Sequence, residues 1–261
     1  MKEPYVKKII ARYNGEGQIQ ETIDDVVTEF PLTLFVNGKE VVTLVCTPND
    51  LKELGIGFLI SEGFIADFSE VVSLDLQEEG FLNIRLNKEI KNTGTFLRRN
   101  IASCCGKGRA GLYFINDARQ VKSIDSAKKV NLSDCLTNMK ILEERSELFH
   151  LTGGVHSAGL IDGKSILFYY EDIGRHNTID KVIGSAVINQ ITTFDKSLIL
   201  SGRISSEIVI KAARASIPVI ISKAAPTDLA VDLGEELNIS IIGFTRGQKL
   251  NIYSCKERII L

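Results

Sequence analysis

Several features that would place this chain in a membrane, on nucleic acid or outside the cell are missing from its 261 residues. No apolar run reaches the roughly 18 residues that a membrane-spanning helix needs. Residues 1–17 lack the long apolar stretch and small-residue cleavage site of a secretory signal. The formal net charge is −2, so no global basic field attracts nucleic acid. We therefore expect a cytoplasmic protein that binds neither membranes nor nucleic acid, and any anion site must be built locally.

The sequence is also poor in metal-binding and disulfide patterns. An odd number of cysteines without a secretory signal argues against a disulfide framework. None of the three histidines has the spacing of a zinc motif, and two adjacent cysteines are poorly placed to hold one zinc ion. We expect no catalytic metal ion. The five cysteines are Cys46, Cys104, Cys105, Cys135 and Cys255.

The first half of the chain has the pattern of a β-rich unit with one helix. Apolar runs at 31–36 and 39–46 are joined by Asn37-Gly38, a pair that suits the positive φ angles of a hairpin turn. A helix is expected between Pro48 and Gly63, and residues 81–87 alternate like a half-buried strand. This pattern predicts a β-rich N-terminal domain over residues 1–125.

The second half alternates helices with strands. Ser133 is expected to cap a helix that runs to about Phe149. Strand and helix alternation predicts a mixed or mostly parallel sheet covered by helices, which is an α/β domain (α+β for the whole chain) over residues 126–261. The expected strands are 155–161, 165–171, 197–200, 218–222 and 240–244, with helices around 179–187, 208–213 and 229–237.

Polar segments follow four of these strands, and ligands bind beyond the carboxyl ends of strands in such sheets. Each segment carries a cation, and three of them begin a helix, whose N-terminal N–H groups favour anions. The same segments also fit a purely structural role, because Ser205 and Thr227 are good helix caps. Agreement among all four favours a site for a phosphate-bearing ligand. The four segments are 171–177, 201–206, 223–227 and 244–249. In the first two of them, the candidate ligand-binding residues are Arg175, His176, Ser201 and Arg203.

A basic, glycine-containing loop at 98–109 holds Cys104 and Cys105 beside four cations. A positive surrounding favours the thiolate form of cysteine, which is the nucleophile. Free cysteine usually prefers burial, so two thiols in a polar loop indicate chemistry more than packing. An inert surface loop is the alternative. The other three cysteines are expected to be packing residues.

Taken together, these segments resemble the FdhD/NarQ family of formate dehydrogenase accessory sulfurtransferases. The resemblance covers nearly the whole chain, from residues 46–65 to residues 251–259. The segments that carry it, in the family's order, are 98–109, Thr152–Ala158, Glu171–Asn177, Ser201–Arg203 and Gly243–Gly247.

The resemblance implies a function and a fold. Cys104 would take persulfide sulfur from a cysteine desulfurase and pass it to the molybdenum or tungsten bis-pterin guanine dinucleotide cofactor, bound transiently as substrate, for the formate dehydrogenase apoenzyme. The C-terminal domain would have the three-layer αβα fold of cytidine deaminases with a mixed sheet, and the protein would be a homodimer. The family's cofactor-binding segment corresponds to Phe244, Thr245, Arg246, Gly247, Gln248 and Lys249.

One position departs from the family pattern Ser-Cys-Gly-x-Cys-Gly. Lys107 stands at the second cysteine, and Cys105 falls on the first glycine. Either Cys104 works alone, or Cys105 supplies a second thiol from a different place. The departure keeps a non-enzymatic cofactor chaperone as an alternative function. A deaminase is disfavoured, because the helix starts lack the cysteine, histidine and glutamate groups of a zinc deaminase.

Overall fold

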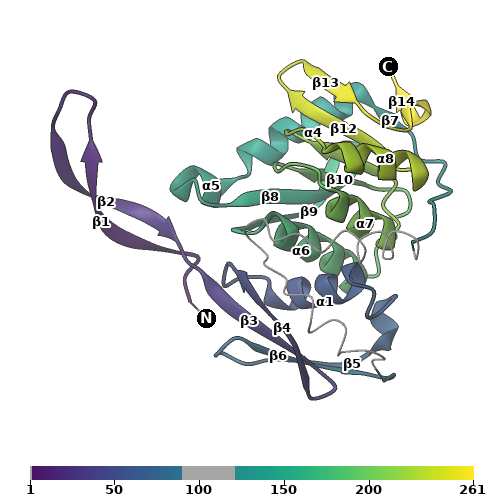
Figure 1. Cartoon of the computed structure of the whole chain (residues 1–261), viewed down its shortest axis with the longest axis horizontal. Helices are drawn as coiled ribbons and strands as arrows, with labels where there is room; N and C mark the ends of the chain where they lie inside the picture. The colour runs from purple at the N-terminus through teal and green to yellow at the C-terminus, as the bar shows by residue number, and fades with distance from the viewer. Residues whose placement is uncertain (1, 90–120) are drawn as a thin grey trace.

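The computed structural model describes residues 2–89 and 121–261 (Figure 1). In its N-terminal part, Asn37 and Gly38 have φ angles of 50° and 77°, so the predicted hairpin turn is confirmed. Helix α1 (Leu51–Ser61) packs against the sheet, and Gly63, with φ 76°, follows its end. The sheet has the order β4-β3-β6-β5, formed by β3 (Phe30–Val36), β4 (Lys39–Cys46), β5 (Val71–Leu76) and β6 (Phe81–Leu86), with a short 3-10 helix η1 (Phe68–Glu70) before β5.

The C-terminal part is built on a six-stranded sheet with the order β13-β12-β11-β10-β8-β9. Strands β10, β11 and β12 run parallel to one another, while β8 runs antiparallel to both β9 and β10. The mixed sheet predicted from the alternating pattern is confirmed. The strands are β8 (His156–Asp162), β9 (Ser165–Asp172), β10 (Ser197–Leu200), β11 (Val219–Ser222), β12 (Ser240–Arg246) and β13 (Lys249–Ile252).

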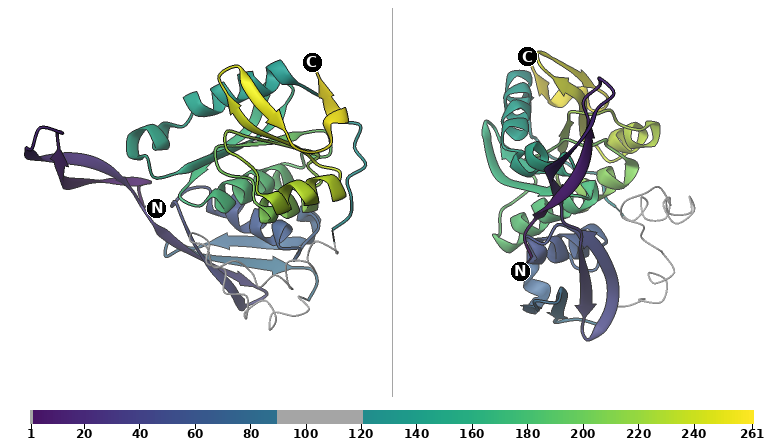
Figure 2. Two further views of the ribbon diagram at one scale, coloured as in Figure 1. Left: turned by 45° about the horizontal axis from the view of Figure 1, so that its top comes forward. Right: turned by 90° about the vertical axis from the view of Figure 1, so that its left-hand side faces the viewer.

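Helices cover both faces of this sheet (Figures 1 and 2). Because side chains alternate along a strand, Leu198 and Leu200 pack with α6, α7 and α8, whereas Ile199 packs with α4 on the other face. The predicted three-layer arrangement is therefore present. The helices are α4 (Leu132–Glu144), α5 (Glu147–Thr152), α6 (Arg175–Ile188), α7 (Ser206–Arg214) and α8 (Asp228–Glu236), and η2 (Lys256–Arg258) leads into β14 (Ile259–Ile260), which pairs with β7 (Val130–Asn131).

The two parts share one hydrophobic core through α1 and α6. Gly57 of α1 and Gly184 of α6 lie at the crossing, where an added Cβ would stand 1.7 Å and 1.9 Å from backbone oxygens of the opposite helix. The same buried cluster contains residues of β3, α1, α6 and α7. The division near residue 125 stays a prediction about domains, while the described core runs through both parts.

Buried charged pairs join α6 to β9 and to α7 beside this contact, and Ser61 of α1 bonds to one of them. Lys181 lies 2.8 Å from Asp172, and both side chains are inaccessible to solvent. Lys211 lies 2.7 Å from Asp180, which also accepts a hydrogen bond from Ser61 of α1. Burial raises the pKa of Asp180, and the charge of Lys211 opposes this shift. Losing one partner of such a pair leaves a buried charge uncompensated, so these pairs strongly favour this helix arrangement.

The predicted helix from Ser133 to about Phe149 was wrong in two respects. Its N-cap is Asn131, whose side chain accepts a hydrogen bond from the N–H of Ser133. The helix also breaks at Ser146, whose buried hydroxyl donates to the carbonyl of Leu142. A second helix, α5, then begins because the Glu171 carboxylate accepts the N–H groups of two first-turn residues.

A two-stranded ribbon, β1 (Tyr5–Tyr13) and β2 (Ile19–Val27), was not predicted. It is paired along its whole length, from Tyr5 opposite Val27 to Tyr13 opposite Ile19. The ribbon extends away from the rest of the molecule (Figures 1 and 2). Its sequence does not alternate strictly between apolar and polar residues, which is why the strand signal was weak.

Candidate functional site

The four polar segments singled out in the sequence lie along one edge of the large sheet. Strand β9 runs in the same direction as β10, because each is antiparallel to β8. The carboxyl ends of β9, β10, β11 and β12 therefore share an edge. At about 4.8 Å per strand, four strand spacings separate β9 from β12 by roughly 20 Å.

At the β9 end of this edge, Arg175 begins α6 and lies against Gly202, where an added Cβ would be 3.4 Å from both Arg175 Cβ and His156 Nδ1. Ser201 Oγ accepts the N–H of Ser157 at 3.0 Å, which ties the β10 segment to β8. Burial, and then the charge of Arg175, lower the pKa of His156. His156, which the sequence favoured only as a structural residue, thus lies beside two predicted site residues as a neutral ring.

The remaining predicted residues of this half take different places. His176 lies 3.3 Å from the Glu207 carboxylate and so links the starts of α6 and α7. Arg203 is exposed. Thr227 caps α8 as predicted, by accepting the N–H of Ala230, but Ser205 makes no side-chain cap bond to α7.

Three buried polar atoms along this edge have no hydrogen-bond partner among the described residues. They are Arg175 Nε, Ser205 Oγ and Thr245 Oγ1, which follow or end three different strands. Buried polar groups are normally paired, because an unpaired one costs about 1–3 kcal/mol. A ligand on this edge would give these atoms partners.

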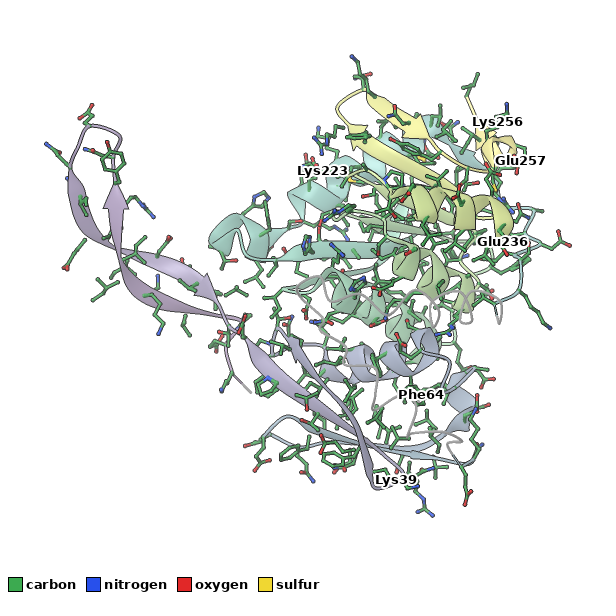
Figure 3. All side chains as sticks on the ribbon, in the orientation of Figure 1. Lys39, Phe64, Lys223, Glu236, Lys256 and Glu257 are labelled. Carbon is green, nitrogen blue, oxygen red and sulfur yellow. The ribbon has the colours of Figure 1, made fainter. Side chains whose placement is uncertain are left out.

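The β12–β13 turn carries the segment that the resemblance assigned to cofactor binding. Phe244 is exposed and has a φ angle of 51°, a left-handed conformation that strains a side chain of this kind. The Arg246 guanidinium lies 5.7 Å from the centre of its ring, and Arg246 Nε donates to the Lys223 carbonyl at 2.9 Å. Lys223, which Figure 3 labels, in turn pairs with Glu143 of α4 at 2.7 Å.

A cleft of about 400 Å³ separates this turn from α4. One wall is the turn itself, with Gly247 at a φ angle of 56° and no atom close to where its Cβ would be. The sequence did not single out α4 as a site element, because its amphipathic pattern indicates only packing. The cleft is lined by Thr245, Arg246, Gly247 and Gln248 of the turn and by Ser133, Leu136, Thr137, Met139, Lys140 and Glu143 of α4.

Cys104, Cys105 and Lys107 lie outside the described residues. The other three cysteines are buried. Burial raises the pKa of Cys46 and Cys135 to about 12 and that of Cys255 to about 11, so each stays a protonated thiol near neutral pH.

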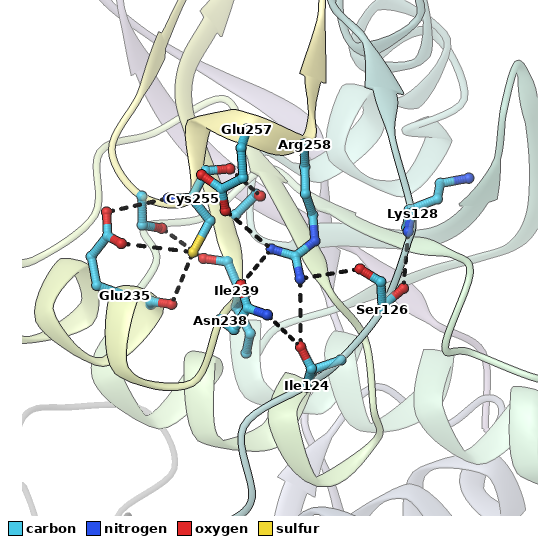
Figure 4. Close-up of polar contacts among 12 residues, drawn as sticks. Ile124, Ser126, Lys128, Glu235, Asn238, Ile239, Cys255, Glu257 and Arg258 are labelled. Atoms are coloured by element: carbon cyan, nitrogen blue, oxygen red, sulfur yellow. Dashed lines mark hydrogen bonds and ion pairs between the residues drawn. The ribbon is translucent and has the colours of Figure 1, made fainter.

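Figure 4 shows the contacts of the buried Cys255 thiol. Its sulfur contacts the Gly234 carbonyl at 3.6 Å and the Glu235 carboxylate at 3.8 Å. Nearby, Arg258 donates to Asn238 at 2.9 Å. These contacts join the end of the chain to α8, which is a packing role.

The described residues contain neither a metal-binding cluster nor a membrane-spanning helix. Residues 2–89 and 121–261 contain no group of three or more histidines, cysteines or carboxylates placed to hold a metal ion. No helix in this described part is long and apolar enough to cross a bilayer.

Known proteins of similar sequence match this chain over nearly its full length. The chain is 46% identical over 256 residues to a protein of Bacillus pumilus (strain SAFR-032) named "Sulfur carrier protein FdhD", covering 97% of each. A protein of the same name from Bacillus subtilis (strain 168) is 45% identical, over 94% of this chain and 94% of its own length. Another from Staphylococcus aureus (strain MRSA252) is 46% identical, over 96% of this chain and 95% of its own length.

A solved structure and a family model extend the comparison. The crystal structure of a putative formate dehydrogenase accessory protein from Desulfotalea psychrophila superposes with a TM-score of 0.82 at 23% identity, covering 99% of this chain and 100% of that one, and so has the same fold. Residues 27–260 match the model of the FdhD/NarQ family. By sequence and fold together, the chain belongs to the FdhD/NarQ family.

Proposed function

We propose that this protein is a cytoplasmic sulfurtransferase that carries sulfur as a persulfide on Cys104. A cysteine desulfurase supplies the sulfur, and the acceptor is the molybdenum or tungsten bis-pterin guanine dinucleotide cofactor of a formate dehydrogenase. The names of relatives that are 45–46% identical over almost the whole chain support sulfur carriage. The observation that carries the cofactor part is the cleft between α4 and the β12–β13 turn, with Arg246 and Lys223 beside it.

The loading step needs one nucleophile. The Cys104 thiolate attacks the terminal sulfur of the desulfurase persulfide, a new S–S bond forms, and the desulfurase cysteine leaves as a thiolate. Delivery of this sulfur at the sulfide level needs a second thiol as the two-electron reductant: it attacks the Cys104 sulfur, an S–S bond forms between the two, the bond to the outer sulfur breaks, and hydrosulfide leaves toward the cofactor. Incubation with a desulfurase and labelled cysteine tests this step: label on Cys104 supports the carrier, whereas cofactor binding without any label would support the cofactor chaperone instead.

The cofactor would lie along the sheet edge. Its phosphates would be held by cations and by backbone N–H groups, since the chain as a whole is slightly acidic and offers no general attraction. Arg175, Arg203 and Lys223 follow three different strands of the same edge, and Arg246 ends a fourth, β12. Phe244 adds an exposed aromatic face on which a ring can stack.

Arg246→Ala tests the cleft directly with GDP as a fragment of the cofactor. The substitution should weaken GDP binding by roughly 1.5–3 kcal/mol, the scale of a hydrogen bond to a charged group. Affinity should also fall as salt is raised, because part of it is charge attraction. Calorimetry on both proteins measures the effect, and Lys256→Ala, which removes an exposed cation far from the turn, is the control. Equal affinities in Arg246→Ala and wild type would remove this turn from the site.

We also propose that the protein is a homodimer joined through the β1–β2 ribbon. Ile9 and Ile23 are cross-strand partners and are 76% and 63% exposed, and Tyr13 and Ile19 form a second exposed pair on the same face. An isolated two-stranded ribbon is marginal in water, and this one extends away from its own body. A second copy of this chain is a partner that is always available to cover the exposed face of the ribbon. The exposed Phe149 of α5, which lies next to β2, would then also take part in the dimer interface.

Replacing Ile9 and Ile23 together by lysine should convert the dimer to a monomer, because like charges would then face each other on the buried ribbon. Sedimentation or light scattering measures the mass. Gln20→Lys, on the opposite face of the ribbon, should leave the dimer intact. A wild-type protein that is monomeric at micromolar concentration would contradict the proposed dimer.

A further inference from the structure

The α4 wall of the cleft is long enough to hold a nucleotide lengthwise. Its lining residues recur at intervals of three and four and therefore share one face of the helix. From Ser133 to Glu143 this face extends about 15 Å at 1.5 Å per residue. The half-buried Leu136 supplies an apolar surface for a flat ring, with Met139 packed in the core beneath it, and the Thr245 hydroxyl, buried and unpartnered among the described residues, belongs to the opposite wall.

Glu143 is the one carboxylate among the described residues that line this cleft. In a site for phosphate, a carboxylate repels the ligand and lowers affinity. Apart from its pairing with Lys223, its charge favours only a ligand group that donates hydrogen bonds. The partly exposed ion pair with Lys223 engages one of its two oxygens, Oε1, at 2.7 Å, beside the cleft that Glu143 lines. A carboxylate accepts through both oxygens, so it can receive two parallel donors.

We propose that Glu143 recognises the 2-amino-4-oxo pyrimidine edge of the ligand by accepting from its ring N–H and its amino group. This inference rests on the proposed function, because both the guanine and the pterin of a bis-pterin guanine dinucleotide present that edge. Glu143 is then a specificity residue that selects guanine over other bases, and Lys223 is a positioning residue that orients it. Arg246 and the N–H groups beside Gly247 take the phosphates.

Calorimetry with three nucleoside diphosphates separates recognition from simple charge. GDP carries the amino group, IDP lacks it, and XDP has an oxygen in its place. Wild-type protein should prefer GDP over IDP and XDP. Glu143→Gln should bind GDP about 10- to 100-fold more weakly, the range expected for hydrogen bonds to a charged acceptor. It should bind XDP more tightly than wild type does, because the new amide donates to the oxygen.

Glu147→Gln, an exposed residue at the start of α5, makes the same change of charge outside the cleft and should alter none of the three affinities. Tighter binding of all three nucleotides by Glu143→Gln would overturn the inference, since Glu143 would then only compete with phosphate for Lys223. Equal weakening of GDP, IDP and XDP binding by Glu143→Gln would overturn the inference as well, because the preference for GDP over the other two would be unchanged. If wild-type protein bound no GDP, the proposed cofactor cleft itself would fail.

Discussion

Cys104→Ser is expected to abolish both persulfide formation and the maturation of formate dehydrogenase. A serine hydroxyl cannot attack a sulfane sulfur or hold it as a persulfide. Three of the five cysteines are excluded as carriers by their burial, which keeps each of them protonated. Four cations within six residues of Cys104 favour its thiolate. The remaining thiol, Cys105, is its immediate neighbour.

Mass spectrometry after incubation with a cysteine desulfurase and cysteine measures the gain of one sulfur atom, and formate dehydrogenase activity in cells measures maturation. Substituting serine for Cys46, Cys135 or Cys255 should leave activity largely intact. A partial loss in Cys105→Ser would show that the neighbouring thiol shares the transfer. Full maturation supported by the Cys104→Ser protein would rule out sulfur transfer through this residue.

Gly184→Val is expected to destabilise the protein by at least about 3 kcal/mol, the upper range for forcing extra atoms into a packed core. Even the first added carbon would stand 1.9 Å from the Glu53 carbonyl oxygen, so α1 and α6 would have to separate. Separation would also loosen the bond from Ser61 to Asp180. Gly57→Val should have a similar effect, since its Cβ would stand 1.7 Å from the Asp180 carbonyl.

Urea unfolding followed by circular dichroism measures the free energy of unfolding in these variants. Gly153→Asn is the matched control: Gly153 has a φ angle of 65° with open space around it, and asparagine tolerates that conformation. Because α1 joins the N-terminal sheet to α6, the two parts should loosen together. An average substitution costs about 1 kcal/mol. If Gly184→Val changed the free energy of unfolding by no more than that, the close crossing of α1 and α6 would be contradicted.

Much of the fold could be predicted from local patterns. Asn37-Gly38 between two apolar runs identifies its hairpin because a two-residue hairpin turn needs positive φ at both positions, which Asn and Gly tolerate. The short apolar runs at 197–200 and 218–222 are buried strands because both their faces are covered. The break of the helix at Ser146 was missed, since it depends on a Glu171 carboxylate more than twenty residues away. Local propensity contains no information about such a partner.

The sequence by itself identified the candidate groups, a cysteine in a basic loop and a cation near the end of each of four strands. Only the tertiary structure made α4 the second wall of the cleft, because α4 approaches the β12–β13 turn only once both have packed on the sheet. It also decided that Glu143 meets Lys223, eighty residues later, and that the ribbon extends away from the other described residues. Pairings between distant segments depend on packing geometry, which no local pattern of residues records.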